Sequence, residues 1–242
     1  MKKTNLFLPV MVFVLMLSTS CIFDLSAITG KGKIVTENRN AKDFTSVELQ
    51  TAANVEIVKG NSFVVSATDY ENLIQYLVVE VIDNRLIIKK KPNSPNLWNS
   101  KAKVMVTLPD PLYSMKLTGS GNIRVVSAFN DLGVLSLSGS GNIELKNDCR
   151  LKKLEAQISG SGNINATGTV EDLYAKISGS GNISFAKLIA KTGNCTISGS
   201  GNVYVFIENK LDAYLSGSGD IVYSGTPSVN SHLSGSGHIY KN

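Results

Sequence analysis

Residues 158–183 decide the fold, and they read I-S-G-S-G-N-I-N-A-T-G-T-V-E-D-L-Y-A-K-I-S-G-S-G-N-I. The same seven-residue segment opens and closes this stretch, and its Gly-Ser-Gly core occurs seven times in the chain. Successive copies begin 18 to 21 residues apart, which is typical of solenoid proteins, in which every repeat forms one structural unit. The first glycines of the copies are Gly119, Gly139, Gly160, Gly179, Gly199, Gly217 and Gly235.

Aligning the seven copies shows which repeat positions are apolar. The position two residues before the first glycine and the position four residues after it hold only leucine, isoleucine or valine. Apolar residues recur at even offsets with mostly polar residues between them, which indicates β-strands with one buried face. Stacked coils would merge these apolar columns into one core. The sequence therefore predicts an all-β fold, a parallel β-helix or β-solenoid of about 20-residue coils over residues 113–242.

The two glycines of each copy fall at positions where the alternation points inward. Either the chain bends there with a positive φ, or the section is too narrow for a side chain. The positions between and after the glycines point outward and predict two ladders of stacked side chains, which are the candidate ligand-facing surface. The serine ladder consists of Ser120, Ser140, Ser161, Ser180, Ser200 and Ser218. The asparagine ladder consists of Asn122, Asn142, Asn163, Asn182 and Asn202, continued by Asp220 and His238.

Residues 1–20 comprise a basic start, a 12-residue apolar run and small residues before Cys21, which is the pattern of a secretion signal. The apolar run is too short for a membrane-spanning helix, which needs about 20 residues. The segment resembles the lipobox of bacterial lipoproteins, although Ser18 stands where that motif usually carries leucine. We therefore predict a lipoprotein signal peptide, lipidation of Cys21, and a tether to the membrane over residues 21–30. The alternative is an ordinary signal peptide cleaved near Ala27.

Residues 31–112 lack the Gly-Ser-Gly repeat but alternate apolar and polar residues in several short runs. Turn-forming residues such as Lys59-Gly60-Asn61 separate these runs, so the segment is predicted to be rich in β-strands. A short helical turn fits around residues 70–76. The segment either begins the solenoid with irregular coils or forms a β-cap over its first edge, which would otherwise invite aggregation.

The net charge of the chain and the distribution of its basic residues bear on nucleic-acid binding. The chain carries a net charge of +5, which becomes +3 without the two lysines of residues 1–20, and its basic residues are scattered. Nucleic-acid binding needs basic residues gathered on one face and is therefore not expected.

Cys149 and Cys195 fall in different columns of coils roughly 9–10 Å apart along the axis. That separation is beyond the reach of a disulfide.

The repeat offers no arrangement that points to catalysis. The outward column five residues after the first glycine has no group of carboxylates at the separation that glycoside hydrolases use. His238 would stack near Asp220 on the same face as Ser236, but neighbours two apart on a strand are about 7 Å apart, too far for a nucleophile and its base. The G-G-x-G-x-D pattern of calcium-binding repeats is absent. We expect no catalytic site, no metal and no cofactor.

The complete set of motifs resembles one known family. The repeated I-S-G-S-G-N-I segments follow an F-x-x-V-x-L start at residues 44–49, an N-V-E-I-V-K-G strand at residues 54–60 and a D-N-R-L-I-I hairpin at residues 83–88. This set is similar to the auto-transporter adhesin, head GIN domain family over about residues 40–240. The resemblance implies a right-handed parallel β-helix, a lipoprotein signal and an adhesive function, but it carries over no functional residues.

Three functional classes are compatible with this sequence. The first is a non-catalytic, lipid-anchored adhesin of the cell envelope, whose two ladders contact a glycan or an envelope or host protein. The exposed tyrosines expected to contribute are Tyr174, Tyr204, Tyr214 and Tyr240. The second class is a structural or self-associating envelope spacer, which would form homo-oligomers, and the third is a polysaccharide-active β-helix enzyme. We expect the first, held at the outer membrane, with its periplasmic or surface orientation left open.

Overall fold

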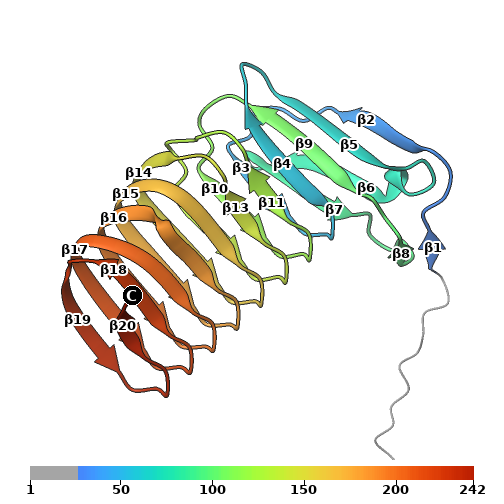
Figure 1. The fold of residues 1–242 in the computed structure, drawn as a ribbon. Coiled ribbons are helices and arrows are strands. Elements are labelled where there is room, and N and C mark those ends of the chain that lie inside the picture. Colours follow the sequence, from blue (N-terminus) through green and yellow to red (C-terminus); the bar gives the residue numbers. More distant parts are fainter. Residues whose placement is uncertain (1–26) are drawn as a thin grey trace, which may run out of the picture.

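The structure is a computed structural model that describes residues 27–242. These residues form an elongated stack of β-coils (Figure 1). The described part contains no α-helix, and its one turn of 3-10 helix, η1 (Ile74–Tyr76), lies where the sequence predicts a helical turn. The predicted all-β parallel β-helix is confirmed, with coils of about 20 residues and about six turns.

Two columns of parallel strands run the length of the solenoid (Figure 1). Each strand is hydrogen-bonded to the strand one coil away, so the backbone groups of every inner coil are satisfied on both sides. The first column follows the order β7 (Arg85–Lys90), β3 (Ser46–Leu49), β10 (Ser114–Leu117), β12 (Val134–Leu137), β14 (Cys149–Ile158), β15 (Ile164–Ile177), β16 (Ile183–Ile197), β17 (Val203–Leu215) and β19 (Ser228–Leu233). The second column follows the order β9 (Lys103–Leu108), β4 (Asn54–Lys59), β11 (Ile123–Val125), β13 (Ile143–Leu145), the first residues of β15, β16 and β17, then β18 (Ile221–Gly225) and β20 (Ile239–Lys241).

The register of these strands places the predicted apolar columns on top of one another. Ile158 is paired with Leu137 on one side and with Ile177 on the other, and all three side chains are buried. The second column keeps the same register from Ile123 to Ile239. Burying one such side chain stabilises a fold by roughly 1.5–3 kcal/mol. The shared apolar interior is therefore the main force that holds the coils together.

Residues 31–112 both begin the solenoid and cap it. β3 and β4 form a coil that pairs with β10 and β11, and β7 and β9 form a further coil on its outer side. Beyond this coil the pairing becomes antiparallel: β6 (Leu77–Ile82) pairs with β7, β5 (Val64–Tyr70) pairs with β9, and β2 (Ile34–Arg39) pairs with β5. The irregular-coil interpretation and the cap interpretation therefore describe different strands of one segment.

The structure explains why each repeat has two glycines. Among the described glycines, a positive φ occurs only at Gly32, Gly168 and Gly225, none of which belongs to a Gly-Ser-Gly copy. Instead, each turn lies directly against the turn of the preceding coil. A Cβ added to Gly162 would lie 1.7 Å from the carbonyl oxygen of Gly141. The glycines are therefore required by the close approach of two backbones and not by a left-handed bend.

Cys149 and Cys195 are buried free thiols in different coils. Cys195 is paired in register with Ala175 on one side and Ala213 on the other, in a column of small core side chains. Burial raises the pKa of its thiol to about 12, so the group stays neutral and unreactive at ordinary pH. Cys195 therefore serves as a small core residue.

A separate two-stranded sheet lies at the end of the molecule farthest from the C-terminal coil (Figure 1). There β1 (Ile28–Thr29) pairs in parallel with β8 (Leu97–Trp98). The predicted signal segment and Cys21 lie outside the described residues. Over residues 27–242, none of the helical structure has the length and apolar character needed to cross a bilayer.

Candidate binding surface

The serine ladder lies on the outside of the Gly-Ser-Gly turns, and all six of its serines are exposed. From the second copy onward, the backbone N–H of each serine donates to the carbonyl oxygen of the first glycine one coil before. Ser180, for example, donates to Gly160 over 3.0 Å. The ladder therefore presents hydroxyl groups from rigid turns at intervals of about 4.8 Å. Its contact with a ligand stays a prediction.

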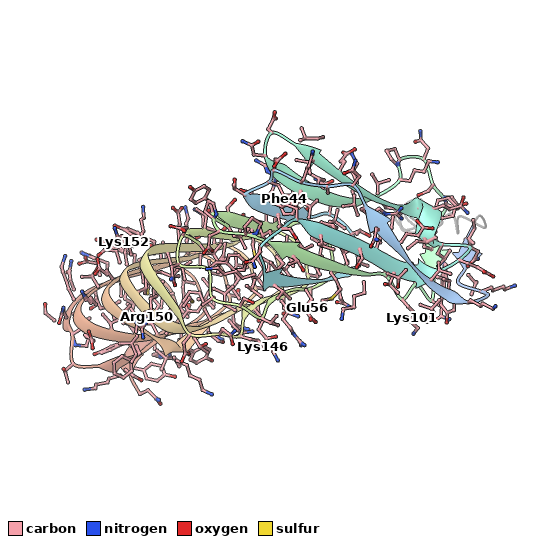
Figure 2. All side chains as sticks on the ribbon, turned by 90° about the horizontal axis from the view of Figure 1, so that it is seen from above. Phe44, Glu56, Lys101, Lys146, Arg150 and Lys152 are labelled. Carbon is pink, nitrogen blue, oxygen red and sulfur yellow. The ribbon has the colours of Figure 1, made fainter. Side chains whose placement is uncertain are left out.

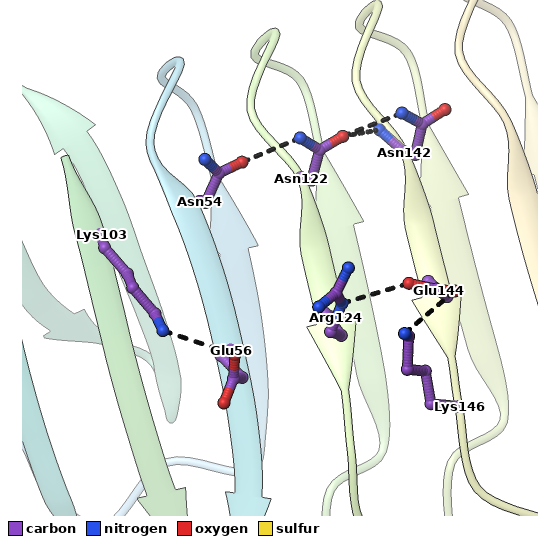
Figure 3. Close-up of polar contacts among 8 residues, drawn as sticks. All are labelled: Asn54, Glu56, Lys103, Asn122, Arg124, Asn142, Glu144 and Lys146. Atoms are coloured by element: carbon purple, nitrogen blue, oxygen red, sulfur yellow. Dashed lines mark hydrogen bonds and ion pairs between the residues drawn. The ribbon is translucent and has the colours of Figure 1, made fainter. Parts of the chain in front are cut away.

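The asparagine ladder is a chain of hydrogen bonds along the solenoid axis, and its first rungs are drawn in Figure 3. Oδ1 of Asn142 accepts two bonds from Asn163 in the next coil, one from its backbone N at 3.1 Å and one from its Nδ2 at 2.9 Å. The same two bonds link all neighbours from Asn122 to Asn202. The ladder thus gives a partner to a backbone N–H that lies in the turn, before the next strand begins.

The last two positions of the asparagine ladder, Asp220 and His238, make the same kind of contact between coils. The carboxylate of Asp220 accepts from the backbone N–H of His238 at 2.8 Å, as an asparagine Oδ1 would. Aspartate keeps the acceptor that the next coil needs, although its side chain donates nothing. No coil of the described structure follows His238, so its side chain has no backbone N–H to satisfy. The contact between His238 and Asp220 is therefore the final rung of the ladder.

A groove of about 610 Å³ crosses the second column over β9, β4, β11 and β13, beside the first rungs of the asparagine ladder. Its charged and amide side chains project from five successive coils, the last through Asn165 at the start of β15, and the close-up in Figure 3 shows most of them. These residues are Asn54, Glu56, Lys103, Asn122, Arg124, Asn142, Glu144 and Asn165. Most of the residues that line the groove are therefore polar, and they are carried by a rigid sheet, with Val55 and Ile123 between them.

Acidic and basic side chains alternate along this groove (Figure 3). Nζ of Lys103 lies 3.5 Å from Oε2 of Glu56, and Nε of Arg124 lies 3.2 Å from Oε2 of Glu144. Lys146 approaches the other oxygen of Glu144 at 3.9 Å. All five side chains are partly exposed, so these ion pairs add little stability. Their remaining donors and acceptors are available to a ligand.

Of the eight charged and amide residues that line the groove, the sequence predicts only Asn122 and Asn142 as site residues. Asn54, Glu56 and Lys103 are missed because they belong to coils without Gly-Ser-Gly. A usable signal is present at residues 49–55, which read L-Q-T-A-A-N-V where the next coil reads L-T-G-S-G-N-I. The register aligns the two segments from the leucine to the last apolar residue. Thr51 and Ala53 stand at the two glycine positions and Ala52 at the serine position, which hides this copy from a search for Gly-Ser-Gly.

The four tyrosines suggested as ligand contacts do not gather in one place. Tyr174 has the ammonium group of Lys153 4.7 Å from its ring centroid. Tyr214 is stacked on His232 of the next coil, with ring centroids 4.9 Å apart. Both lie on the first column, whereas the other two tyrosines lie on the second column. The tyrosines therefore mark separate exposed positions and not one aromatic site.

A buried carboxylate links the first coils on the other column. Glu48 in β3 is 3% exposed, and its oxygens lie 2.9 Å from Nη1 of Arg85 and 3.1 Å from Nζ of Lys116. Burial alone would raise the pKa of this carboxyl, but hydrogen bonds from Gln50, Lys116 and Arg85 outweigh burial and lower the pKa below its usual value. Glu48 is therefore ionised at neutral pH and ties β7, β3 and β10 together.

The family description "Putative auto-transporter adhesin, head GIN domain" matches residues 43–227. The chain belongs to the head GIN domain family. This membership confirms the resemblance seen in its motifs. Because the family is adhesin-type, it indicates a protein of the cell envelope or surface. No curated protein matches the chain.

Solved structures share the head GIN domain fold over most of this chain. A "putative adhesin" from Bacteroides fragilis has a TM-score of 0.81 at 24% identity, with 89% of this chain and 100% of that chain covered. A "putative adhesin" from Parabacteroides distasonis has a TM-score of 0.77 at 23% identity, with coverages of 89% and 100%. A "putative lipid binding protein" from Parabacteroides distasonis has a TM-score of 0.73 at 28% identity, with coverages of 89% and 99%.

Proposed function

We propose that this head GIN domain protein is a lipid-anchored adhesin of the cell envelope that binds a glycan without catalysis. The polar groove over β9, β4, β11 and β13 is the observation that carries the proposal. Its volume of about 610 Å³ lies within the range of ligand sites, roughly 300–1,000 Å³. The groove is open and spans several coils, which suits an oligosaccharide better than a single compact ligand.

The chemistry of the groove matches that of sugar hydroxyl groups, which both donate and accept hydrogen bonds. The carboxylates of Glu56 and Glu144 only accept, whereas the guanidinium of Arg124 and the ammonium of Lys103 only donate. Each asparagine of the ladder uses one Nδ2 hydrogen within the ladder and keeps the other. Because strands hold all these groups in place, a ligand would not have to order them on binding.

Binding has more support than catalysis in this groove. Glu56 and Glu144 lie two coils apart, with Arg124 between them in the register. Two coil spacings are roughly 10 Å, slightly more than the ~6.5–9.5 Å between the carboxyl groups of inverting glycosidases. Each carboxylate also has a cation as its neighbour, whereas a general acid needs surroundings that favour its neutral form.

The proposal includes lipidation of Cys21 and attachment to the outer membrane. The signal-like residues 1–20 and the small residues before Cys21 support this anchor. A diacylated cysteine holds a protein to a bilayer stably, where one acyl chain would bind only marginally. The membrane and a glycan are therefore the two partners that we assign to this protein.

A glycan array probed with the mature chain tests the proposal. We expect Arg124→Ala and Glu144→Gln to weaken binding of a retained glycan by roughly tenfold or more, because each removes a charged hydrogen-bonding group. Glu171→Gln is the matched control, since Glu171 also forms one exposed ion pair, at 3.1 Å to Lys191, but outside this groove. The control should bind as the parent does.

Three other results would contradict the groove assignment. Binding that survives both groove variants but is lost in Ser161→Trp would move the site to the serine ladder. Binding of an envelope or host protein without any glycan would change the class of ligand. Concentration-dependent self-association without any ligand would favour the envelope spacer.

A further inference from the structure

The end of the molecule that carries β1 and β8 exposes the only tryptophan of the 242-residue chain. Trp98 in β8 is 59% exposed, so most of its indole contributes nothing to the core. The backbone of Trp98 is held in place, because the backbone N–H of Gly30 donates to its carbonyl oxygen at 2.9 Å. A large, exposed amphipathic side chain is thus carried by a backbone that pairs with β1, the first strand of the described chain.

Three segments meet at this end, which we name the β1–β8 end: residues 28–33, residues 69–76 and residues 90–101. Nδ2 of Asn72 donates to the carbonyl oxygen of Thr29 at 2.9 Å, and the backbone N–H of Lys101 donates to Asp69 at 2.8 Å. Lys101 marks this end in Figure 2, opposite the C-terminal coils. The β1–β8 end is therefore one connected surface at an extremity of the solenoid.

The exposed charge of the β1–β8 end is mainly positive. Its acidic residues are Asp69 and Glu71, and Asp69 is 1% exposed because Ser100 and two backbone N–H groups surround its carboxylate. Only Glu71 therefore offsets the exposed lysines. These lysines are Lys31, Lys33, Lys91 and Lys101. An exposed indole among lysines is the combination found where proteins meet anionic lipid headgroups.

The length of the N-terminal segment points to the same surface. Ala27 follows Cys21 by six positions, and six extended residues reach at most about 20 Å. If Cys21 is lipidated, as proposed above, the β1–β8 end is the part of the described molecule that must stay close to the bilayer. The C-terminal coils lie at the far end of the solenoid (Figure 1).

We propose that the β1–β8 end rests on the membrane surface, with Trp98 at the headgroup level and its lysines against anionic lipid headgroups. This inference depends on the lipid anchor of the proposed function. The anchor raises the local concentration of lipid around this end, so weak individual contacts suffice to hold it. The contact fixes the orientation of the solenoid, which then projects its coils away from the membrane toward a ligand.

Trp98 supplies the test, because all tryptophan emission comes from this one site. The lipidated full-length mature protein is reconstituted into phosphatidylethanolamine and phosphatidylglycerol vesicles, with and without lipids brominated near their headgroups. We expect the emission maximum to shift to the blue and the emission to be quenched in brominated vesicles. The double variant Lys91→Glu with Lys101→Glu should lose most of this quenching. The matched control, Lys152→Glu with Lys187→Glu on exposed positions of the solenoid, should retain it.

The possible results distinguish a failure of the membrane contact from a failure of the lipid anchor. Protein that floats with the vesicles while Trp98 emission stays unshifted and unquenched would overturn the membrane contact and leave the anchor intact. A mature mass without acyl chains on Cys21 would overturn the anchor. In that case the unlipidated chain is titrated with anionic and with neutral vesicles, and a shift of Trp98 emission with anionic vesicles alone is required. A blue shift that persists in lipid-free protein would show that another protein surface covers Trp98.

Discussion

The coil formed by β3 and β4 and the coils that follow it have the same two strand columns but different turns between them. The first coil crosses from one column to the other through Thr51-Ala52-Ala53, and later coils cross through Gly-Ser-Gly. In the later coils each turn lies against the turn of the preceding coil, where a Cβ would collide with a carbonyl oxygen. On the outer side of the first coil, the chain between β7 and β9 leaves through β8 instead of crossing as a tight turn.

This difference teaches what the glycines are for. They are required wherever two turns stack directly, and alanine is accepted where the neighbouring coil takes a longer route. The detour that relieves Ala53 is also the segment that carries Trp98, Lys91 and Lys101 of the β1–β8 end. One local change in the stack therefore provides both the tolerance for alanine and the exposed end.

The largest expected effect comes from moving alanine into a stacked turn. In Gly162→Ala the new Cβ would lie 1.7 Å from the carbonyl oxygen of Gly141, so two coils must separate. We expect a loss of more than about 4 kcal/mol in the free energy of unfolding, measured by urea denaturation, or failure to fold. Ala53→Gly is the reverse change in the first coil and should cost only about 0.5–1 kcal/mol. Equal losses in the two variants would refute the close-approach explanation.

An intermediate effect is expected from interrupting the asparagine ladder. Asn163→Leu removes the acceptor for the backbone N–H of Asn182, which should destabilise the fold by about 1–3 kcal/mol. Asn163→Asp keeps that acceptor and should cost clearly less, as the natural Asp220 suggests. His238→Ala, at the position with no coil after it, should change stability by less than about 0.5 kcal/mol. Thermal unfolding of the three variants would show this order, and an equally large effect at the last position would contradict it.

The ion pairs of Glu48 should give a smaller, pH-dependent effect that belongs to the first coils alone. The pKa of Glu48 is lowered in the folded state from a usual value of 4.5, so its contribution is fully present above that value. The contribution is lost as the pH falls through the lowered folded pKa. Glu48→Gln should therefore be less stable than the parent at pH 7 and equally stable well below pH 4. A stability difference that grows on acidification would have the wrong sign.

The repeated part of the fold could be predicted from the sequence because the same residue types recur at the same positions of every repeat. The leucines and isoleucines at fixed offsets define two buried columns, and the asparagines define one ladder. The sequence alone does not decide whether a bend or a narrow section requires the paired glycines. Only the position of the preceding carbonyl, as at Gly141, decides between them.

The order of the first coils could not be predicted, because it depends on contacts between residues far apart in the chain. β7 and β9 follow β3 and β4 in sequence but lie on their outer side, so the next strands return to the opposite side. This order brings Glu56 and Lys103 beside Arg124 in the groove. No local period marks such a neighbour, so the sequence does not predict Asn54, Glu56 and Lys103 as site residues.

The most direct test of the stacked register uses pairs of cysteines in the serine ladder. Ser161 and Ser180 occupy adjacent coils about 4.8 Å apart, within the Cα separation of about 4.4–6.8 Å that disulfides accept. Ser161→Cys with Ser180→Cys should oxidise rapidly to an intramolecular disulfide, measured by mass and by loss of two free thiols. Ser140→Cys with Ser180→Cys skips one coil and should remain reduced. Rapid bridging of the second pair, or none of the first, would contradict the in-register stack.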